Sequence, residues 1–377
     1  MTLARVPVYS GFLLSGFLLS LLGAALPGWG FHLTEDHATA GWLFFAVAVG
    51  LLAASQFPRT WASPPAGCCL AVLSLLTFGF FPAPVRFAIQ LAAWFTVGFA
   101  SGLLNRRMIE SLAVAYRANP PVAVAKVAIT FIAGCFTAGV FTSASFRFGF
   151  VSQTPAALAL VPAAFALLYW RQPLPVVSTL ESPASPYVSQ FSRPGIMIVT
   201  LLLVVQSGSV WIAGGWLPIF LSHRIGLGPE DALGWLAVYW FVLVAGLLGG
   251  WYSLRLVRRS RMLVISSATV LVSCFLLSST NNTLGAGAAV VVLALGFSGL
   301  SVLLAQNLRP RLPGYNPVTL NRLLMLMLAG GLFSAWLAGM LASVWGLTAI
   351  LILPVMNTLS ATALLLVLWL ESKVTGR

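Results

Sequence analysis

A cluster of polar residues interrupts an otherwise apolar segment near position 105. It contains Asn105, Arg106, Arg107 and Glu110. On a helix, Glu110 is one turn from both arginines and can pair with either of them. The two arginines outnumber the carboxylate, so the cluster keeps a net positive charge. Charges within a membrane are costly and usually mark a pathway, so this pattern favours a basic lining for an anionic solute.

Further polar side chains in other apolar segments are candidates for the same lining. Lys126 shares a helical face with small residues, which are Thr130, Gly134 and Thr137. Gln306 and Asn307 end one apolar run, and Arg322 begins another beside Asn321. The alternative is that the apolar segment ends near residue 105, in which case the arginines are ordinary flanking charges. Both interpretations stay open from the sequence alone.

The elements that must position these residues follow from composition. Charged residues make up 7% of the chain, hydrophobic residues 59%, and the mean hydropathy is +0.98. The stretches from Met262 to Leu308 and from Leu323 to Leu370 contain no charged residue. Each is too long for one membrane crossing and about right for two, because a spanning helix needs roughly 20 residues. The chain is predicted to be an all-α integral membrane protein, since continuous apolar runs lack the alternation of a β-barrel.

Turn residues and charges divide the chain into about twelve predicted crossings. The N-terminal run is predicted to be the first crossing and not a removed signal peptide. Pro229, Glu230 and Asp231 predict a helix start, and Ser278 to Thr283 predicts a polar turn. The predicted spans are 8–30, 40–56, 66–83, 86–115, 119–143, 153–170, 196–221, 231–252, 262–280, 284–306, 319–343 and 346–370.

The basic residues assign an orientation to these crossings. With the N-terminus in the cytoplasm, all of the 20 Lys and Arg residues except Arg86, Arg147 and Arg224 fall on the cytoplasmic side. This asymmetry is the positive-inside rule. We therefore expect a multi-pass protein of the cytoplasmic (inner) membrane with both termini in the cytoplasm. The net charge of +13 is explained by this topology, so no nucleic-acid partner is expected.

The chain also repeats itself. Gly98-Phe99-Ala100-Ser101-Gly102-Leu103 recurs as Gly296-Phe297-Ser298-Gly299-Leu300, and Gly134-Cys135-Phe136-Thr137-Ala138 recurs as Gly331-Leu332-Phe333-Ser334-Ala335. The two matches have nearly the same offset, and Leu26-Pro27 recurs as Leu217-Pro218. Residues 1–170 and 196–377 are therefore predicted to form two pseudo-symmetric six-helix bundles, joined by a cytoplasmic linker over 171–195.

At this point the chain resembles the major facilitator superfamily of transporters. The match is best at Gly250, Ser253, Arg255, Arg258 and Arg259, after the eighth crossing, where the superfamily pattern is roughly G-x-x-[AS]-D-R-x-G-R-[KR]. Leu254 replaces the aspartate and Val257 replaces the second glycine. The segments Gly214-Gly215-Trp216-Leu217-Pro218 and Gly226-Leu227-Gly228-Pro229 resemble the sugar-permease-like branches. The resemblance implies that Gly250, Arg255, Arg258 and Arg259 take part in gating, through a weak latch.

The resemblance also implies which crossings line a central cavity, namely the first, fourth, seventh and tenth. Gln206 and Trp211 of the seventh crossing become candidate substrate contacts, although Trp211 could instead face lipid. Trp216 is interpreted as part of an interfacial aromatic belt. His32, His37 and His223 are expected to be solvated in outer loops.

The expected function is secondary transport of a small polar solute, an organic anion or a sugar, by alternating access. No enzyme, cofactor or metal site is predicted, and the protein is expected to be a monomer in the bilayer. Glu110 should stay ionised between its arginines, so transport should depend little on a proton gradient. The alternatives are an exporter of lipophilic compounds or lipids, and a non-transporting scaffold or pigment-assembly factor with this fold.

Overall fold

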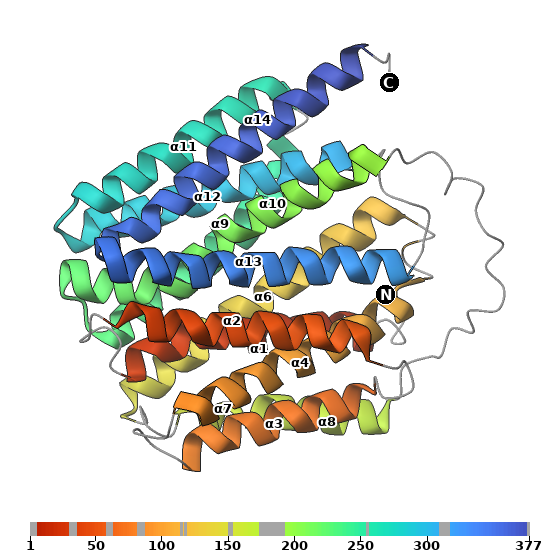
Figure 1. Ribbon diagram of the computed structural model, residues 1–377, viewed down its shortest axis with the longest axis vertical. Helices are drawn as coiled ribbons and strands as arrows, with labels where there is room; N and C mark the ends of the chain where they lie inside the picture. Colours follow the sequence, from red (N-terminus) through yellow and green to blue (C-terminus); the bar gives the residue numbers. More distant parts are fainter. Residues whose placement is uncertain are drawn as a thin grey trace.

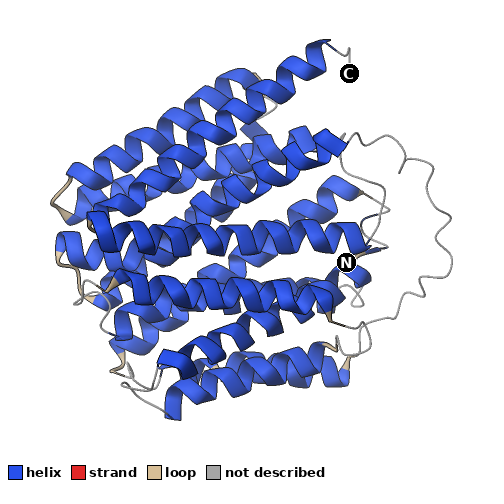
Figure 2. Cartoon of the chain, viewed as in Figure 1, coloured by secondary structure: helices blue, strands red, loops and turns tan. Residues whose placement is uncertain are grey.

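The computed structural model describes residues 6–29, 36–57, 63–80, 87–113, 116, 119–149, 154–172, 193–253, 256–308 and 317–374. Within these residues the chain is helical throughout and contains no strand (Figure 2). The helices lie roughly side by side in one elongated bundle, with the first half of the chain at the bottom and most of the second half above it (Figure 1). The predicted all-α membrane fold is confirmed.

The bounds of the helices are as follows. The first half contains α1 (Val6–Ala25), the 3-10 helix η2 (Leu26–Trp29), α2 (His37–Gln56), α3 (Pro64–Phe80), α4 (Phe87–Ser111), α6 (Pro120–Arg147), α7 (Thr154–Leu158) and α8 (Leu160–Arg171). The second half contains α9 (Arg193–Ile225), α10 (Pro229–Ser253), α11 (Arg259–Ser279), α12 (Thr283–Leu308), α13 (Pro317–Trp345), the 3-10 helix η7 (Leu347–Leu351) and α14 (Ile352–Val374).

Several helices begin at residues that bind the free backbone N–H groups of the first turn. The Asp36 carboxylate accepts a hydrogen bond from the N–H of Thr39 at 3.1 Å, and the Asn282 side chain accepts one from Gly285 at 2.6 Å. The predicted start of α10 at Pro229 is confirmed, with two acidic residues in its first turn. These caps satisfy groups that would otherwise remain unpaired at a helix start.

A proline and a glycine mark the two irregular crossings. Pro162 has no N–H to donate to the carbonyl of Leu158, which is where α7 ends and α8 begins. The last crossing begins as η7 after Gly346, whose φ of 81° is left-handed. The sixth and twelfth predicted crossings are therefore each built from two helical pieces.

Eleven helices of the described chain are long and apolar enough to cross a membrane. The remaining predicted crossing corresponds to α3, which is apolar but shorter, with its apolar part spanning Pro64–Phe78. The predicted span 66–83 ends three residues beyond α3, in part of the chain that is not described. The predicted twelve-crossing layout is otherwise matched helix by helix.

The two ends of the bundle differ in which helix ends they contain. α1 begins and α14 ends at one end, on the right in Figure 1, which we call the terminal end. The opposite, distal end contains the start of α2 and α10 and the last turns of α9 and α13. Within each half, α2 packs on α4, α1 on α6, α9 on α13 and α11 on α12. The predicted linker lies largely outside the described residues, so the boundaries of the two bundles stay a prediction.

The two halves meet in what we call the distal seam. It consists of α1 against α9 at Gly23, α2 against α13 at Gly41, and α6 against α10 at Gly139. A Cβ on Gly23 would lie 2.6 Å from the Gly214 carbonyl oxygen, so only glycine permits this approach. Pro218 leaves that carbonyl without its usual helical donor. The contact between α1 and α9 is made by Gly23 and Gly214. Each of these glycines lies a few residues before one of the repeated segments, Leu26-Pro27 and Leu217-Pro218.

Candidate functional site

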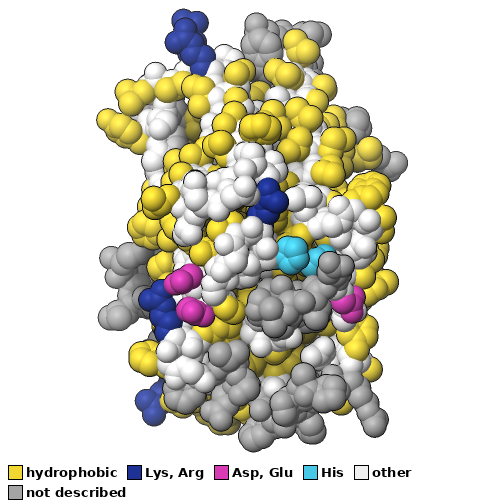
Figure 3. Space-filling model, turned by 90° about the vertical axis from the view of Figure 1, so that its left-hand side faces the viewer, with side chains coloured by type: hydrophobic (Ala, Val, Ile, Leu, Met, Phe, Trp, Pro, Cys, Tyr) yellow, Lys and Arg dark blue, Asp and Glu magenta, His cyan; other side chains and the backbone are white. Residues whose placement is uncertain are grey.

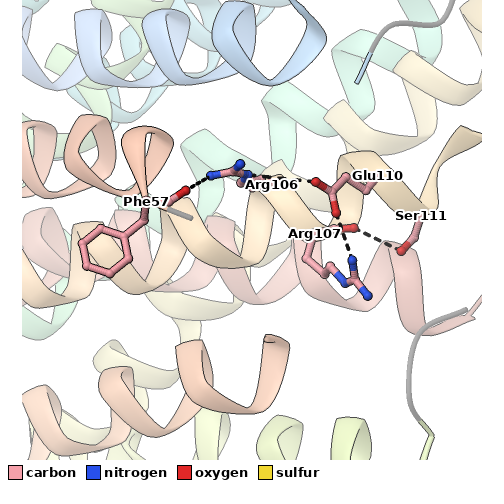
Figure 4. Close-up of polar contacts among 5 residues, drawn as sticks. All are labelled: Phe57, Arg106, Arg107, Glu110 and Ser111. Atoms are coloured by element: carbon pink, nitrogen blue, oxygen red, sulfur yellow. Dashed lines mark hydrogen bonds and ion pairs between the residues drawn. The ribbon is translucent and has the colours of Figure 1, made fainter. Parts of the chain in front are cut away.

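The predicted cluster lies on α4, which continues through it to Ser111. Arg107 donates a hydrogen bond through Nη1 to Glu110 Oε2 at 3.0 Å, and Arg106 Nε lies 4.0 Å from Glu110 Oε1 (Figure 4). Arg106 also donates through Nη1 to the carbonyl of Phe57, the residue that follows α2. The alternative in which the helix ends near residue 105 is wrong, because these contacts hold the additional turn in place.

The direction of this cluster is fixed by its neighbours on α4. Met108 lies against Gly11 of α1, where an added Cβ would be 2.4 Å from the Met108 sulfur. At 3.6 residues per turn, Arg106 and Glu110 point about 160° away from Met108. They therefore face away from α1, and Arg106 instead binds the C-terminal end of α2, where a helix attracts cations. The cluster is therefore hydrogen-bonded to the C-terminal end of α2 and does not face α1.

Asn105 lies on the other side of α4. Asn105 and Ser101 are one turn apart and point within about 60° of Met108, so they lie toward α1. Both are fully buried, and neither the Asn105 amide nor the Ser101 hydroxyl has a hydrogen-bond partner among the described residues. Sequence reasoning identified Asn105 but missed Ser101, although the i, i+4 spacing of the two polar residues was a signal.

A third buried polar side chain, Ser15, lies on α1. Ser15 is one turn beyond Gly11 on the same face, and it is also fully buried and unpartnered in the described chain. Because α1 and α4 run in opposite directions, the contact between Gly11 and Met108 sets Ser15 at the level of Asn105. We call Ser15, Ser101 and Asn105 the α1–α4 polar site. Leaving an amide unpaired in such surroundings costs about 1–3 kcal/mol, which indicates a site able to bind a hydrogen-bonding group.

The two predicted residues of the seventh crossing are placed on α9 and are buried. Gln206 donates through Nε2 to the carbonyl of Phe297 and to Ser301, both at 3.2 Å, so its amide joins α9 to α12. Trp211 does not face lipid. It packs at 6.3 Å from Phe131 of α6 and 6.0 Å from Trp240 of α10, measured between ring centroids.

The remaining predicted contacts lie on three different helices. Lys126 is exposed on α6 and Arg322 is exposed on α13, whereas the neighbouring Asn321 is buried with an unpartnered Oδ1 in the described chain. Gln306 is half-buried near the end of α12, and the side chain of Asn307 lies outside the described residues. The structure does not bring these residues together with the α4 cluster through any contact among the described side chains.

The predicted gating residues lie where α10 passes into α11. Gly250 is buried, and an added Cβ would be 2.9 Å from Val302 of α12. Arg255 lies outside the described residues. Arg258 and Arg259 are exposed at the start of α11, and neither side chain makes a hydrogen bond or ion pair with another described residue. These side chains extend from a helix N-terminus, which does not attract cations, so their role in gating stays a prediction.

Two expectations about aromatic and histidine residues are wrong. Trp216 is not in an interfacial belt: it is fully buried and donates through Nε1 to the carbonyl of Ala335 on α13 at 2.8 Å. His37 is not solvated in a loop, since it is the first residue of α2 and only 3% exposed. His223 is exposed as expected, and His32 lies outside the described residues. Both corrections have one cause, which is that the seam between the halves covers these side chains.

The described residues contain no group of three or more His, Cys, Asp and Glu side chains that could hold a metal ion. The cysteines Cys68, Cys135 and Cys274 are buried and Cys69 is exposed, all as free thiols.

Comparison with known proteins gives a consistent result at the level of structure only. The sequence matches no protein-family model, and a search of curated proteins finds no match. The structure is similar to the crystal structure of a D-xylose-proton symporter, with a TM-score of 0.73, 12% identity, and coverage of 95% of this chain and 96% of the other.

Two further solved structures are similar over nearly their whole length. The nucleoside transporter NupG has a TM-score of 0.68 and 12% identity, with 98% of each chain covered. A bacterial homologue of the human lysosomal transporter Spinster, in an inward-facing and occupied conformation, has a TM-score of 0.67 and 14% identity, with 97% and 96% covered. The chain therefore has the fold of these membrane transporters.

Proposed function

We propose that this chain is a secondary transporter that moves a small polar solute across the inner membrane by alternating access. The fold supports this, since the similar structures are of transporters for xylose, for nucleosides and of the Spinster type. The packed distal seam supports it as well, because two bundles that touch mainly at one end can rock about a central site. On this proposal the distal end faces outward, both termini are cytoplasmic, and the protein works as a monomer.

The observation that carries the proposal is the α1–α4 polar site. Ser15 and Ser101 lie within about 4 Å of the middle of their helices along the axis, and Asn105 lies about 9 Å from the middle of α4, at 1.5 Å per residue. Solute sites of such transporters lie near the bilayer midplane. A buried amide with free donor and acceptor atoms, beside two hydroxyl groups, matches the hydroxyl groups of a neutral polar solute.

The same geometry favours a neutral solute such as a sugar over the organic anion. Arg106 binds the end of α2, and Arg107 binds Glu110. An anion would have to displace these bonds to reach either guanidinium. The α1–α4 polar site carries no formal charge, so it offers hydrogen bonds without a compensating cation.

The test is solute binding and counterflow with purified protein. A thermal-shift screen against neutral sugars, nucleosides, carboxylates and amphiphiles should find stabilisation by a neutral hydroxylated compound, because a ligand of the folded state raises its stability. That compound should then show counterflow in liposomes. Selective stabilisation by carboxylates or amphiphiles, or no counterflow by any solute, would contradict the proposal and favour an anion carrier, a lipid exporter or a scaffold.

A pair of variants separates a binding role from a structural one. Asn105→Leu removes the unpartnered amide with little change in size, so the unliganded protein should be as stable as wild type or more stable. Binding of the neutral compound should weaken by about tenfold or more, as expected for loss of one or two buried hydrogen bonds. Arg107→Gln is the matched control on the opposite side of α4, and binding should remain unchanged.

A further inference from the structure

Two asparagines from opposite halves of the chain share an unusual environment. Asn105 of α4 is fully buried, and Asn321 near the start of α13 is 6% exposed. Neither the Nδ2 nor the Oδ1 atom of Asn105 has a hydrogen-bond partner among the described residues, and the same is true of the Asn321 Oδ1 atom. Because buried amides are almost always hydrogen-bonded, these atoms indicate an additional binding partner.

Helix α2 relates the levels of the two asparagines along the bundle, because it packs on both α4 and α13 (Figure 1). On the α4 side, an added Cβ on Gly98 would meet the Val47 carbonyl, and one on Gly102 would lie 2.9 Å from the Leu51 carbonyl oxygen. These two contacts show that α2 and α4 run in the same direction. Continued to Asn105, this register reaches the last turn of α2.

On its other side, α2 runs antiparallel to α13. A Cβ on Gly339 would lie 3.0 Å from the Gly41 Cα, and the Phe45 ring packs on that of Phe333 at 5.3 Å. Continued along both helices, this register sets the last turn of α2 level with the second and third turns of α13.

Asn105 therefore lies near the level of Asn321, within about one helical turn, which is about 6 Å at 1.5 Å per residue. The direction of its side chain follows from its neighbours on α4. Asn105 projects midway between Gly102, which meets α2, and Met108, which meets α1. Its amide is thus aimed between α1 and α2, toward the interior of the molecule.

The direction of Asn321 follows in the same way. It lies 18 residues before Gly339, which is five full turns, so both residues occupy one face of α13. At Gly339 that face meets α2 at Gly41 and α9 at Trp216. Asn321 therefore points between α2 and α9. Since α4 also touches α13 and α1 touches α9, the two amides look into one region between the halves.

The neighbouring charged side chains are directed elsewhere. Arg106 binds the Phe57 carbonyl, Arg107 binds Glu110, and Arg322 is exposed. At the opposite end of the bundle, charged and histidine side chains appear at the surface (Figure 3). The two amides therefore offer uncharged donor and acceptor atoms to whatever lies between them.

We propose that Asn105 and Asn321 are the two sides of one binding site, in which a neutral solute bridges the halves of the protein through its hydroxyl groups. A hydroxyl both donates and accepts, so it can bind either amide, whereas a carboxylate has no hydrogen to donate to the Asn321 Oδ1 atom. The inference rests on the proposed function and extends its site to α13, the eleventh crossing. A solute held by both halves responds to their relative motion.

The first arm of the experiment tests the placement without any solute. Asn105→Cys and Asn321→Cys are combined with Cys69→Ser, since Cys69 is the exposed native cysteine of the described chain. Propane-1,3-diyl bismethanethiosulfonate, a short reagent with two thiol-reactive ends, should link the two positions. After cleavage at a protease site inserted into the linker, the halves should stay joined on a non-reducing denaturing gel.

The matched control combines Asn105→Cys with Leu326→Cys. Leu326 lies near the level of Asn105, but it is 45% exposed and points about 140° away from Asn321 on α13. Its two halves should separate on the gel. A cross-link yield for the asparagine positions no higher than in this control would overturn the placement, and the proposal with it.

The second arm measures binding by thermal shift. The probes are D-glucose and uridine, which are neutral and hydroxylated, and D-gluconate, the carboxylate matched to glucose. A neutral probe should stabilise wild type, and gluconate should not. Asn321→Leu should weaken binding of that neutral probe about tenfold, as expected for loss of a buried hydrogen bond, without lowering the stability of the unliganded protein.

Two further variants separate a binding role from a structural one. Asn321→Ser keeps a hydroxyl acceptor, so it should lose less affinity than Asn321→Leu, and it keeps the test valid if the leucine variant does not fold. Leu326→Ala is the control on another face of α13 and should bind the neutral probe as wild type does. Equal affinity losses in Asn321→Leu and Leu326→Ala would overturn the proposed contact.

Failure of this inference is distinguishable from failure of the proposed function. Unchanged binding in Asn321→Leu, together with weakened binding in Asn105→Leu, would confine the site to the first half and overturn the bridge alone. Stabilisation by gluconate alone, or by none of the three probes, would contradict the neutral solute of the proposed function as well. A cross-link in that last case would mean that the two amides are adjacent but hold no such solute.

Discussion

Two contacts of the distal seam are related by the internal repeat, yet they are built from different chemistry. The offset that aligns Gly134 with Gly331 also aligns Phe136 of α6 with Phe333 of α13. Phe333 packs on Phe45 of α2 at 5.3 Å, and Phe136 packs on Phe241 of α10 at 5.8 Å. The α2–α13 and α6–α10 contacts are therefore sister contacts on the two sides of the seam.

The α2–α13 contact is aromatic and close. Trp336 packs on Trp42 at 5.5 Å and on Phe45 at 5.3 Å, and the backbones meet where Gly41 faces Gly339. Such ring pairs contribute about 0.5–1.5 kcal/mol each beyond the area that they bury. This side of the seam therefore resists separation mainly through packing.

The α6–α10 contact is smaller and more polar. Gly139 faces Ala237, Ser143 donates to the Glu230 carbonyl at 2.9 Å, and Arg147 lies 3.5 Å from Asp231. The Arg147 and Asp231 side chains are both more than half exposed, so water competes for this pair. The comparison indicates that the two sister contacts have diverged. The α2–α13 contact holds the seam, and the α6–α10 contact separates at a lower free-energy cost.

The largest effect is expected from a side chain added at the closer of the two glycine contacts, between Gly41 and Gly339. In Gly339→Leu, the first added atom would already lie 2.7 Å from Trp216 Cζ2 and 3.0 Å from the Gly41 Cα. We expect the seam to fail to close, at a cost of about 3 kcal/mol or more, because backbone and ring cannot both move aside. Distances between spin labels at Phe148→Cys and Leu284→Cys, two exposed positions on the two halves at the distal end, should lengthen.

The sister variant is the control for that result. In Gly139→Leu, the added Cβ would be 3.3 Å from the Ala237 Cα, so its neighbour must shift by only a few tenths of an ångström to accept the first atom. A smaller opening is expected. If Gly139→Leu opened the seam as much as Gly339→Leu, the two sides would be equally tight and the comparison would fail.

Removal of rings should have the next largest effect. Trp336→Ala deletes the ring that contacts both Trp42 and Phe45, and we expect it to destabilise the closed seam by about 2–3 kcal/mol, below the range for a fully buried tryptophan because Trp336 is only half-buried. Phe241→Ala on the other side should cost less, since Phe241 is already 57% exposed. Thermal unfolding of the two variants in the same detergent would measure the difference. Equal losses of stability would contradict the idea that the aromatic α2–α13 contact contributes most to the seam.

How much of this arrangement is readable from sequence depends on the range of the interactions involved. Uncharged runs such as Met262 to Leu308 predict crossings because hydropathy acts locally, and Pro229 predicts a helix start for the same reason. The end of α4 stayed open because it depends on Arg106 reaching the Phe57 carbonyl on another helix. Local pattern alone does not contain that contact.

The candidate site was less predictable than the fold, and for the same reason. From the sequence, Gln206 is a plausible solute contact. In the structure, however, its amide Nε2 donates to two acceptors on α12. His37 follows an acidic segment, which is typical of a surface loop, but α9 and α13 bury it. Ser15 carries no signal by itself, and it gains meaning only when α1 is placed against Asn105 of α4. Such roles depend on helix pairs far apart in the sequence.

The smallest effect that sharpens the comparison concerns the ion pair between Arg147 and Asp231. These residues lie at a helix end in the last turn of α6 and the first turn of α10, and their atoms approach to only 3.5 Å. We expect a coupling energy of about 0.2–1 kcal/mol from a double-mutant cycle with Arg147→Gln and Asp231→Asn, falling as salt is raised. The measurement is thermal or chemical unfolding of wild type, both single variants and the double variant. A coupling of several kcal/mol that persists in molar salt would show that the polar side holds the seam as firmly as the aromatic side, and the proposed asymmetry between the two sister contacts would then be wrong.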